Sequence, residues 1–377
     1  WKNALTNTAV SPEIATLPDV LSTHDCAYIG KWHLDSPKAP YINCANNDGE
    51  LKWNEWCSPD RRHGFKYWHS YGTYDDHLGP MYWDTNAGRQ EFQYVDEWGP
   101  VHETNLAVEF IERASDPFAL VVSMNPPHMP YELVPPRYVD IYLDADIEEW
   151  CRRPNVPPAG TEWGDYYRKN IRNYFAMVTG VDEQFGRILN AIDQAGKTDE
   201  TIVVFTSDHG NCLGIHDKIS KSNYYEEAMR IPFLMRWPDK ITPRSDDLLF
   251  SAPDIYPTLM ELMGLSDDMP SDIEGSGFGG LFLGDNQTER PQSQLYMQIP
   301  YDRPDYGIRG VRTQQYTLAI DLPPEGKPVV ILFDNKADPY QLSNISAEFP
   351  EIVQNLIAGE LTQRLKIAHD PWIRHIN

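Results

Sequence analysis

Apolar residues in this chain follow two spacings, one typical of helices and one typical of strands. Helical patterns lie at residues 12–23, 102–115, 168–195, 254–263 and 348–366. Apolar runs typical of buried strands lie at residues 26–30, 118–123, 201–206, 231–236, 307–311, 316–320 and 329–333. Helix and strand alternate over most of the chain, which is typical of a largely parallel sheet covered by helices on both faces. The pattern therefore predicts an α/β fold.

Two regions depart from this alternation. Residues 38–101 lose the periodicity and are rich in Trp, Tyr, His, Asp, Gly and Pro, so we expect a long aromatic loop insertion there. After the polar, Gly-rich segment 266–294, short strands and one terminal helix predict a smaller α+β subdomain. The predicted division is a main domain over residues 1–290 and a C-terminal subdomain over 291–377 with short antiparallel strands.

Charge and hydropathy narrow the classes of partner. The 377 residues include 32 Lys and Arg against 56 Asp and Glu, a formal net charge of −24. This charge opposes binding to nucleic acids and anionic membranes, so we predict neither as a partner. No run approaches the roughly 18 apolar residues of a membrane-spanning helix. The five cysteines form no CxxC pair; Cys44 and Cys57 could form one disulfide, which leaves the redox compartment open.

Side chains that can bind anions or metals follow several predicted strands. Asp208 and His209 come directly after strand 201–206, where ligands gather in open α/β sheets. A hard divalent ion would suit this pair, although a turn in which Asp208 caps the next helix is the simpler alternative for the motif alone. Lys31 and His33 follow another strand and, two residues apart in an extended segment, would face one anion together.

Two more strand ends extend this set. His128 is held between prolines beyond strand 118–123, although a surface-loop histidine is the commoner interpretation. Lys221 precedes a Tyr-Glu-Glu-Ala segment and strand 231–236; taken alone, it is a solvated lysine. Together the lysines and histidines form a cationic set within an acidic protein. Such a set fits a tetrahedral oxyanion, sulfate or phosphate, held against a metal ion.

The order of these motifs is similar to that of a known enzyme family. The motifs are, in order, GKWH, PPHMP, SDHG and a lysine before YEEA. They resemble those of the formylglycine-dependent sulfatases of the alkaline-phosphatase superfamily, and segments 174–186, 254–259 and 334–342 resemble further parts of that family. The resemblance implies an alkaline-phosphatase-like fold: a mixed, mostly parallel sheet flanked by helices, with the smaller C-terminal α+β subdomain.

The same resemblance implies a role for each motif residue. Asp208 and His209 would supply part of a calcium site, with Mg²⁺ as the less expected ion. Lys31 would contact both the formylglycine and the sulfate. His33 would hydrogen-bond the formylglycine diol and help the sulfated intermediate collapse.

The remaining residues would bind the substrate. His128 and Lys221 would contact sulfate oxygens, and His128 would also lie near the leaving oxygen as a general acid. His216 would lie on the substrate side. The implied reaction is attack of the aldehyde hydrate on sulfur, release of the sugar alcohol and elimination of sulfate.

The nucleophile of this family lies before the GKWH motif, in a C/S-x-P-S-R segment. No such segment precedes Lys31, so we expect the formylglycine upstream of Trp1. The segment Cys57-Ser-Pro-Asp-Arg61 fits C-x-P-x-R, but it follows GKWH and lacks the LTG helix of the family. We therefore do not assign Cys57 as the nucleophile.

The aromatic insertion at residues 38–101 contains the residues that predict the class of substrate. Its aromatic rings can stack on sugar faces or form a small core under a long loop, and the sequence leaves both open. Arg61, Arg62 and His63 are predicted substrate contacts, because residues 61–68 resemble the RRHGFDYW insertion of some polysaccharide sulfatases. We therefore expect a sulfated glycan as substrate and, by analogy, a bacterial periplasmic or extracellular enzyme.

Two alternatives stay open at this point. A phosphonate or phosphate monoester hydrolase of the same superfamily would use a similar metal site, since the tetrahedral anion differs chiefly in charge. A catalytically inactive relative that binds glycans would have kept the fold and lost the nucleophile.

The expected position of the nucleophile makes a prediction about mass. The intact purified protein should weigh more than the 43.3 kDa of this sequence and should yield a formylglycine-bearing peptide from upstream of Trp1. Intact-mass spectrometry with peptide mapping checks both. A mass of 43.3 kDa would contradict the expectation and favour the inactive, binding-only alternative.

Overall fold

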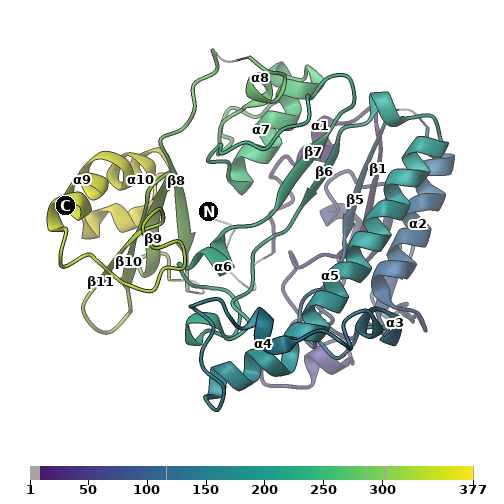
Figure 1. Cartoon of the computed structure of the whole chain (residues 1–377). Coiled ribbons are helices and arrows are strands. Elements are labelled where there is room, and N and C mark those ends of the chain that lie inside the picture. The colour runs from purple at the N-terminus through teal and green to yellow at the C-terminus, as the bar shows by residue number, and fades with distance from the viewer. Residues whose placement is uncertain (1–8, 116, 286, 301–302, 377) are drawn as a thin grey trace. The chain divides into compact units, whose positions relative to one another are not determined.

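The computed structural model describes residues 9–115, 117–285, 287–300 and 303–376 (Figure 1). The chain divides into two compact units, with one boundary inside a long helix. The N-terminal unit comprises residues 7–150 and 168–201. The C-terminal unit consists mainly of residues 151–167 and 202–377. Among the described residues, no helix has the length and apolar character needed to cross a membrane. The division at residue 290 stays a prediction.

The N-terminal unit contains a mixed sheet in the order β4-β3-β2-β1-β5. Its strands are β1 (Asp25–Lys31), β2 (Tyr67–Tyr71), β3 (Met81–Asp84), β4 (Gln93–Tyr94) and β5 (Phe118–Ser123). Strand β1 pairs in parallel with β2 and β5, whereas β3 pairs antiparallel with β2 and β4. The expected mixed sheet is confirmed. Because β1 and β5 are parallel, their carboxyl ends meet at one edge of the sheet.

Strands β2, β3 and β4 lie within residues 38–101, which the sequence analysis treated as one loop insertion. Strands β2 and β3 are buried on both faces, so their residues lack the alternation that identifies a half-buried strand. Several insertion aromatics form a core cluster with Ile42 and Cys44; its buried members include Tyr71, Tyr74, Tyr82 and Trp83. For these rings the small-core alternative is correct.

The helices of this part of the chain are α1 (Leu17–Val20), α2 (Gly99–Arg113), α3 (Pro136–Asp140), α4 (Ile147–Trp150) and α5 (Glu162–Gln194). Figure 1 shows α2 and α5 running beside the sheet. Helix α2 packs Phe110 against Ala27 of β1. Helix α5 lies beside α2, where Arg187 donates a hydrogen bond to Asn105 at 2.7 Å. The N-terminal helix expected over residues 12–23 is much shorter, because Thr16 and Asp19 form a capping box that starts the helix only at Leu17, and the helix ends at Val20.

The C-terminal unit contains two antiparallel sheets. Strands β6 (Val203–Thr206) and β7 (Phe233–Arg236) pair with each other. The second sheet, in the order β11-β10-β9-β8, consists of β8 (Ser293–Gln298), β9 (Gly307–Thr313), β10 (Tyr316–Leu322) and β11 (Val329–Asp334). The helices are α6 (Glu226–Met229), α7 (Ala252–Met263), α8 (Gly279–Phe282), α9 (Pro350–Leu356) and α10 (Thr362–Ile367). The expected C-terminal α+β arrangement is confirmed.

The terminal helix predicted over 348–366 is interrupted by one π-helical segment, Ile357–Leu361. Figure 1 shows α9 and α10 packed on the four-stranded sheet, and Leu361 and Leu365 are fully buried against Val311 and Leu318. Beside this core, Arg309 and Asp370 form a fully buried ion pair with an Nε to Oδ2 distance of 2.5 Å. Breaking such a pair by removing one partner typically costs about 3–5 kcal/mol.

Gly30 sets the close approach of β1 and β5. Its φ is +103°, and a Cβ atom there would lie 2.2 Å from the backbone oxygen of Ser123. The register pairs Gly30 with Ser123 directly before Lys31. No side chain fits at this position, so the end of β1 depends on glycine.

We expect Gly30→Ala to lower the free energy of unfolding by roughly 1–3 kcal/mol, because the added methyl group meets backbone and the left-handed φ strains alanine. Urea denaturation measures the loss. Gly186→Ala in α5 is the matched control, since nothing lies within 4 Å of its added Cβ and alanine favours a helix. Equal stability of the two variants would contradict the assignment.

Candidate active site

Lys31 and Asn125 form the first part of the site, at the ends of β1 and β5. The Lys31 Nζ atom donates to Asn125 Oδ1 at 2.9 Å. Asn125 is buried, and its Nδ2 atom donates to the Tyr74 carbonyl at 3.1 Å and to Asp75 Oδ1 at 3.0 Å. The Lys31 side chain is 16% exposed. The ammonium group is therefore held at the sheet edge, where an anion can reach it.

Asp75 joins Lys31 to His128. Its Oδ1 atom lies 3.7 Å from Lys31 Nζ and 3.3 Å from His128 Nδ1. Burial alone would raise the pKa of Asp75, but the charges of Lys31 and His128 hold that pKa below its usual value. Asp75 was not among the residues predicted for the site. In the sequence, the one feature that could have indicated a role for Asp75 is its position beside a second aspartate in the aromatic insertion.

The His128 imidazole is fixed by backbone as well as by Asp75. Its Nδ1 atom lies 2.7 Å from the Met129 carbonyl, and His77 Nε2 lies 2.8 Å from the His128 carbonyl. Both neighbours of Nδ1 are acceptors, so Nδ1 carries a hydrogen. The structure therefore brings together Lys31 and His128, which lie far apart in the sequence. His33 is exposed, and its ring packs edge-on against Trp53 at a centroid distance of 6.2 Å.

Asp208 and His209 lie in the C-terminal unit, directly after β6. The His209 Nδ1 atom donates to the Gly210 carbonyl at 2.8 Å, and His209 Nε2 lies 3.2 Å from Asp208 Oδ2. A backbone acceptor on Nδ1 leaves Nε2 as the metal-binding nitrogen, a usual arrangement for a histidine ligand. The pair therefore fits one side of a divalent cation. Within the described part of the chain, no group of three or more His, Cys, Asp or Glu residues is arranged to hold an ion.

His216 belongs to a second cluster of the C-terminal unit. Its φ is +57°, and its ring stacks on Tyr225 at 3.7 Å with an interplanar angle of 4°. The His216 Nε2 atom lies 3.3 Å from Glu227 Oε2, while Asn155 and Arg153 donate to Glu227 Oε1 at 2.7 and 3.0 Å. Glu227 therefore organises this cluster.

Glu227 lies in the YEEA segment, but the sequence pattern predicted no role for it. Burial alone would raise the pKa of Glu227, but hydrogen bonds from His216 and Asn155 hold that pKa below its usual value. Lys221, which precedes this segment, is exposed. Its expected contact with sulfate stays a prediction.

Arg61, Arg62 and His63 occupy different environments. Arg61 donates to Asp35 Oδ1 at 2.6 Å and lines a cavity of about 160 Å³. Arg62 is buried, donates to the Cys57 and Thr85 carbonyls, and lies over the Trp68 ring. His63 is also buried. The Arg61 side chain therefore lines a cavity, whereas the side chains of Arg62 and His63 are buried inside the unit. Glycan binding by these three residues stays a prediction.

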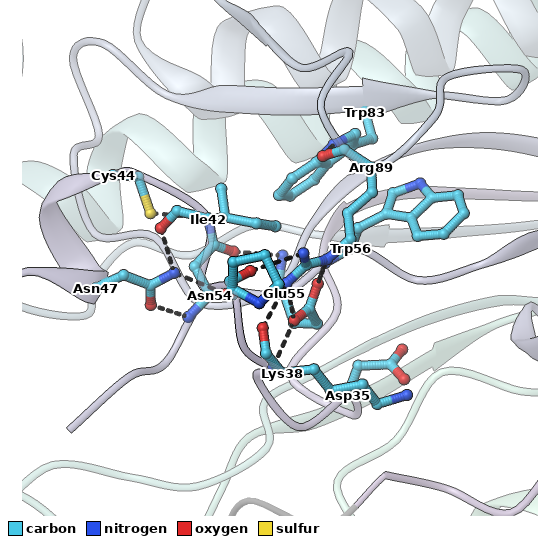
Figure 2. Close-up of polar contacts among 12 residues, drawn as sticks. Asp35, Lys38, Ile42, Cys44, Asn47, Asn54, Glu55, Trp56, Trp83 and Arg89 are labelled. Carbon is cyan, nitrogen blue, oxygen red and sulfur yellow. Dashed lines mark hydrogen bonds and ion pairs between the residues drawn. The ribbon is translucent and has the colours of Figure 1, made fainter.

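Figure 2 shows the charges and amides around this cavity. Glu55 is buried and forms a two-bond ion pair with Arg89, with 2.7 Å from Nε to Oε1 and 2.8 Å from Nη2 to Oε2. Asn47 and Asn54 hold the neighbouring turns. Cys44 and Cys57 are free thiols, so they form no disulfide. Burial raises the pKa of Cys57 far above its usual value, which keeps the thiol protonated.

Comparison with protein families identifies the chain. The model described as "Sulfatase" matches residues 3–265, and the model "N-sulphoglucosamine sulphohydrolase, C-terminal" matches residues 214–369. The chain belongs to the sulfatase family. This family confirms a sulfuric ester hydrolase and the alkaline-phosphatase-like fold expected from the motifs.

Individual relatives agree with this family. The chain is 38% identical to an endo-4-O-sulfatase of Bacteroides thetaiotaomicron, over 93% of this chain and 72% of that protein. It is 31% identical to an ulvan-active sulfatase of Formosa agariphila, over 91% of this chain and 63% of that protein. A solved Bacteroides fragilis structure named yidJ superimposes with a TM-score of 0.94 at 46% identity, covering 98% of this chain and 80% of that one.

The Glu227 cluster of this sulfatase chain makes a prediction about stability. The folded-state pKa of Glu227 lies below its unfolded value, so its contribution is complete above pH 4.5 and is lost as the pH falls through the folded pKa. We expect Glu227→Gln to lower the free energy of unfolding by roughly 1–3 kcal/mol near pH 7, and by less in acid. Denaturation at several pH values measures this. The exposed Glu348→Gln is the control, and a pH-independent difference would contradict the prediction.

Proposed function

We propose that this chain forms the catalytic part of a sulfatase that removes sulfate esters from a sulfated polysaccharide or oligosaccharide. The observation that carries the proposal is the Lys31, Asp75 and His128 group at the ends of β1 and β5, in a chain that belongs to the sulfatase family. A fixed ammonium and a fixed imidazole suit one tetrahedral anion with a leaving oxygen. The named relatives support a glycan substrate, since they include an endo-4-O-sulfatase and an ulvan-active sulfatase.

The residues of the N-terminal unit have separate roles in this proposal. Lys31 binds sulfate oxygens, and its hydrogen bond to Asn125 limits the motion of the ammonium group. His128 contacts the ester and gives a proton to the leaving oxygen, since a sugar alkoxide is a poor leaving group without one. His33, exposed beside Trp53, hydrogen-bonds the nucleophile.

The residues of the C-terminal unit would serve the metal and the substrate. Asp208 and His209 would hold a divalent cation. We propose Ca²⁺, because the resemblance to the formylglycine-dependent sulfatases implies a calcium site and because this hard cation prefers oxygen ligands. When bound, this cation and a formylglycine would supply charge neutralisation and the nucleophile. Lys221 and His216 would contact the substrate, and Glu227 fixes the ring of His216.

Long-range charge works against binding of a sulfated polymer, because the chain carries −24. Recognition must therefore depend on local cations, and Arg61 at its cavity is one candidate. Salt also screens the unfavourable field of the exposed charges at distances beyond about 10 Å at 0.1 M. Because sulfated glycans are met outside the cytoplasm, we propose a periplasmic or extracellular location.

The test compares two esters of the same phenol in the full-length enzyme. A sulfate ester carries one negative charge, whereas a phosphate monoester carries close to two at neutral pH. We expect kcat/KM for 4-nitrophenyl sulfate to exceed that for 4-nitrophenyl phosphate at least about tenfold, equal to about 1.4 kcal/mol of transition-state binding. A preference for phosphate would favour the monoesterase alternative. Binding of sulfated glycans without sulfate release from any of them would favour the inactive relative.

A further inference from the structure

Asp75 is held more firmly than a surface carboxylate. Asn46 Nδ2 donates to Asp75 Oδ2 at 3.0 Å, and the Asp75 backbone nitrogen donates to Asn46 Oδ1 at 3.2 Å. Asn125 donates to the other carboxylate oxygen at 3.0 Å. The side chain is 23% exposed. Two amides on two segments therefore fix the carboxylate in one orientation.

That orientation directs Asp75 Oδ1 at both cations of the N-terminal group. The distance to Lys31 Nζ is 3.7 Å and the distance to His128 Nδ1 is 3.3 Å. The His128 Nδ1 hydrogen is shared between Asp75 and the Met129 carbonyl, so proton exchange with a substrate falls to Nε2. A carboxylate beside Nδ1 favours the imidazolium form over the neutral ring, as in other carboxylate and histidine pairs.

We propose that Asp75 is a positioning residue that orients His128 and keeps its imidazole protonated for donation to the leaving oxygen. This inference rests on the proposed sulfatase function. In the step, the bond between sulfur and the leaving oxygen breaks and its electron pair stays on that oxygen. The Nε2 proton of His128 moves to the same oxygen, the sulfuryl group passes to the oxygen of an attacking hydroxyl, and the proton of that hydroxyl is released to water. His128 becomes neutral while Asp75 keeps its charge.

Other titratable groups near this pair are Lys31, Tyr71, Asp76 and His77. Burial lowers the pKa of His77, which favours the neutral form of that ring. Burial raises the pKa of Tyr71, so this phenol stays protonated. Asp76 Oδ1 instead accepts hydrogen bonds from the backbone nitrogens of Leu78 and Gly79 at 3.1 and 3.0 Å. Asp76 is therefore a matched control, with the same charge and a different partner.

The experiment measures Asp75→Asn and Asp76→Asn in the full-length enzyme with 4-nitrophenyl sulfate and phenyl sulfate. Phenol is a much poorer leaving group than 4-nitrophenol, so its ester depends more on a general acid. We expect Asp75→Asn to lower kcat/KM for phenyl sulfate at least about tenfold more than for 4-nitrophenyl sulfate. The loss should lie in kcat, and Asp76→Asn should leave the ratio of the two esters unchanged.

The pH profile separates proton donation from a purely structural role. With phenyl sulfate, the basic limb of kcat/KM should move to lower pH by roughly one unit in Asp75→Asn, because the imidazolium loses its neighbouring negative charge. In a His128→Ala background the Asp75 change should add little, since the residue it acts through is gone.

Several outcomes would overturn the inference. Equal losses on both esters, a loss confined to KM, or an unmoved basic limb would each show that Asp75 only supports the fold or binds substrate. Wild-type enzyme that releases no sulfate from either ester would instead contradict the proposed function. A urea denaturation curve for Asp75→Asn that matches wild type separates these results from misfolding.

Discussion

The close parallel pairing of β1 with β5 is the constraint on which the N-terminal group depends. Gly30 lies so near the Ser123 backbone that no side chain fits between the strands. The two strands therefore end together, and Lys31 meets Asn125 within hydrogen-bond distance. From Asn125 the contacts continue to Asp75 and then to His128. The group that we propose to bind sulfate is thus built from a backbone approach that the glycine alone permits.

Several charged side chains inside this acidic chain are paired with an opposite charge. Arg309 and Asp370 are fully buried together, and Glu55 is bound by Arg89 through two hydrogen bonds. Glu227 likewise gathers an imidazole, an amide and a guanidinium. A lone buried ion would cost several kcal/mol, so these three carboxylates and their partners fix one another's positions. The excess of acidic residues instead lies on exposed surface, where water solvates it.

Candidate residues were predictable to different degrees. Lys31, His128, Asp208 and His209 each follow a strand, and position after a strand end is readable from an apolar run. Asp75 and Glu227 were not assigned, because each contacts a residue that is distant in the sequence, His128 for Asp75 and Asn155 for Glu227, and no local pattern indicates such contacts. Arg62 and His63 lay in a segment that resembles a glycan-binding insertion, yet the fold buries both.

By itself the sequence determined most of the strands and helices outside residues 38–101, together with the order of the sulfatase motifs. Periodicity is a local property, and so is the position of a residue after a strand. Tertiary structure alone decided that residues 67–84 add strands to the main sheet, because burial on both faces removes the alternating pattern. It also decided that Asp75 stands between Lys31 and His128, since that contact needs three distant segments to meet.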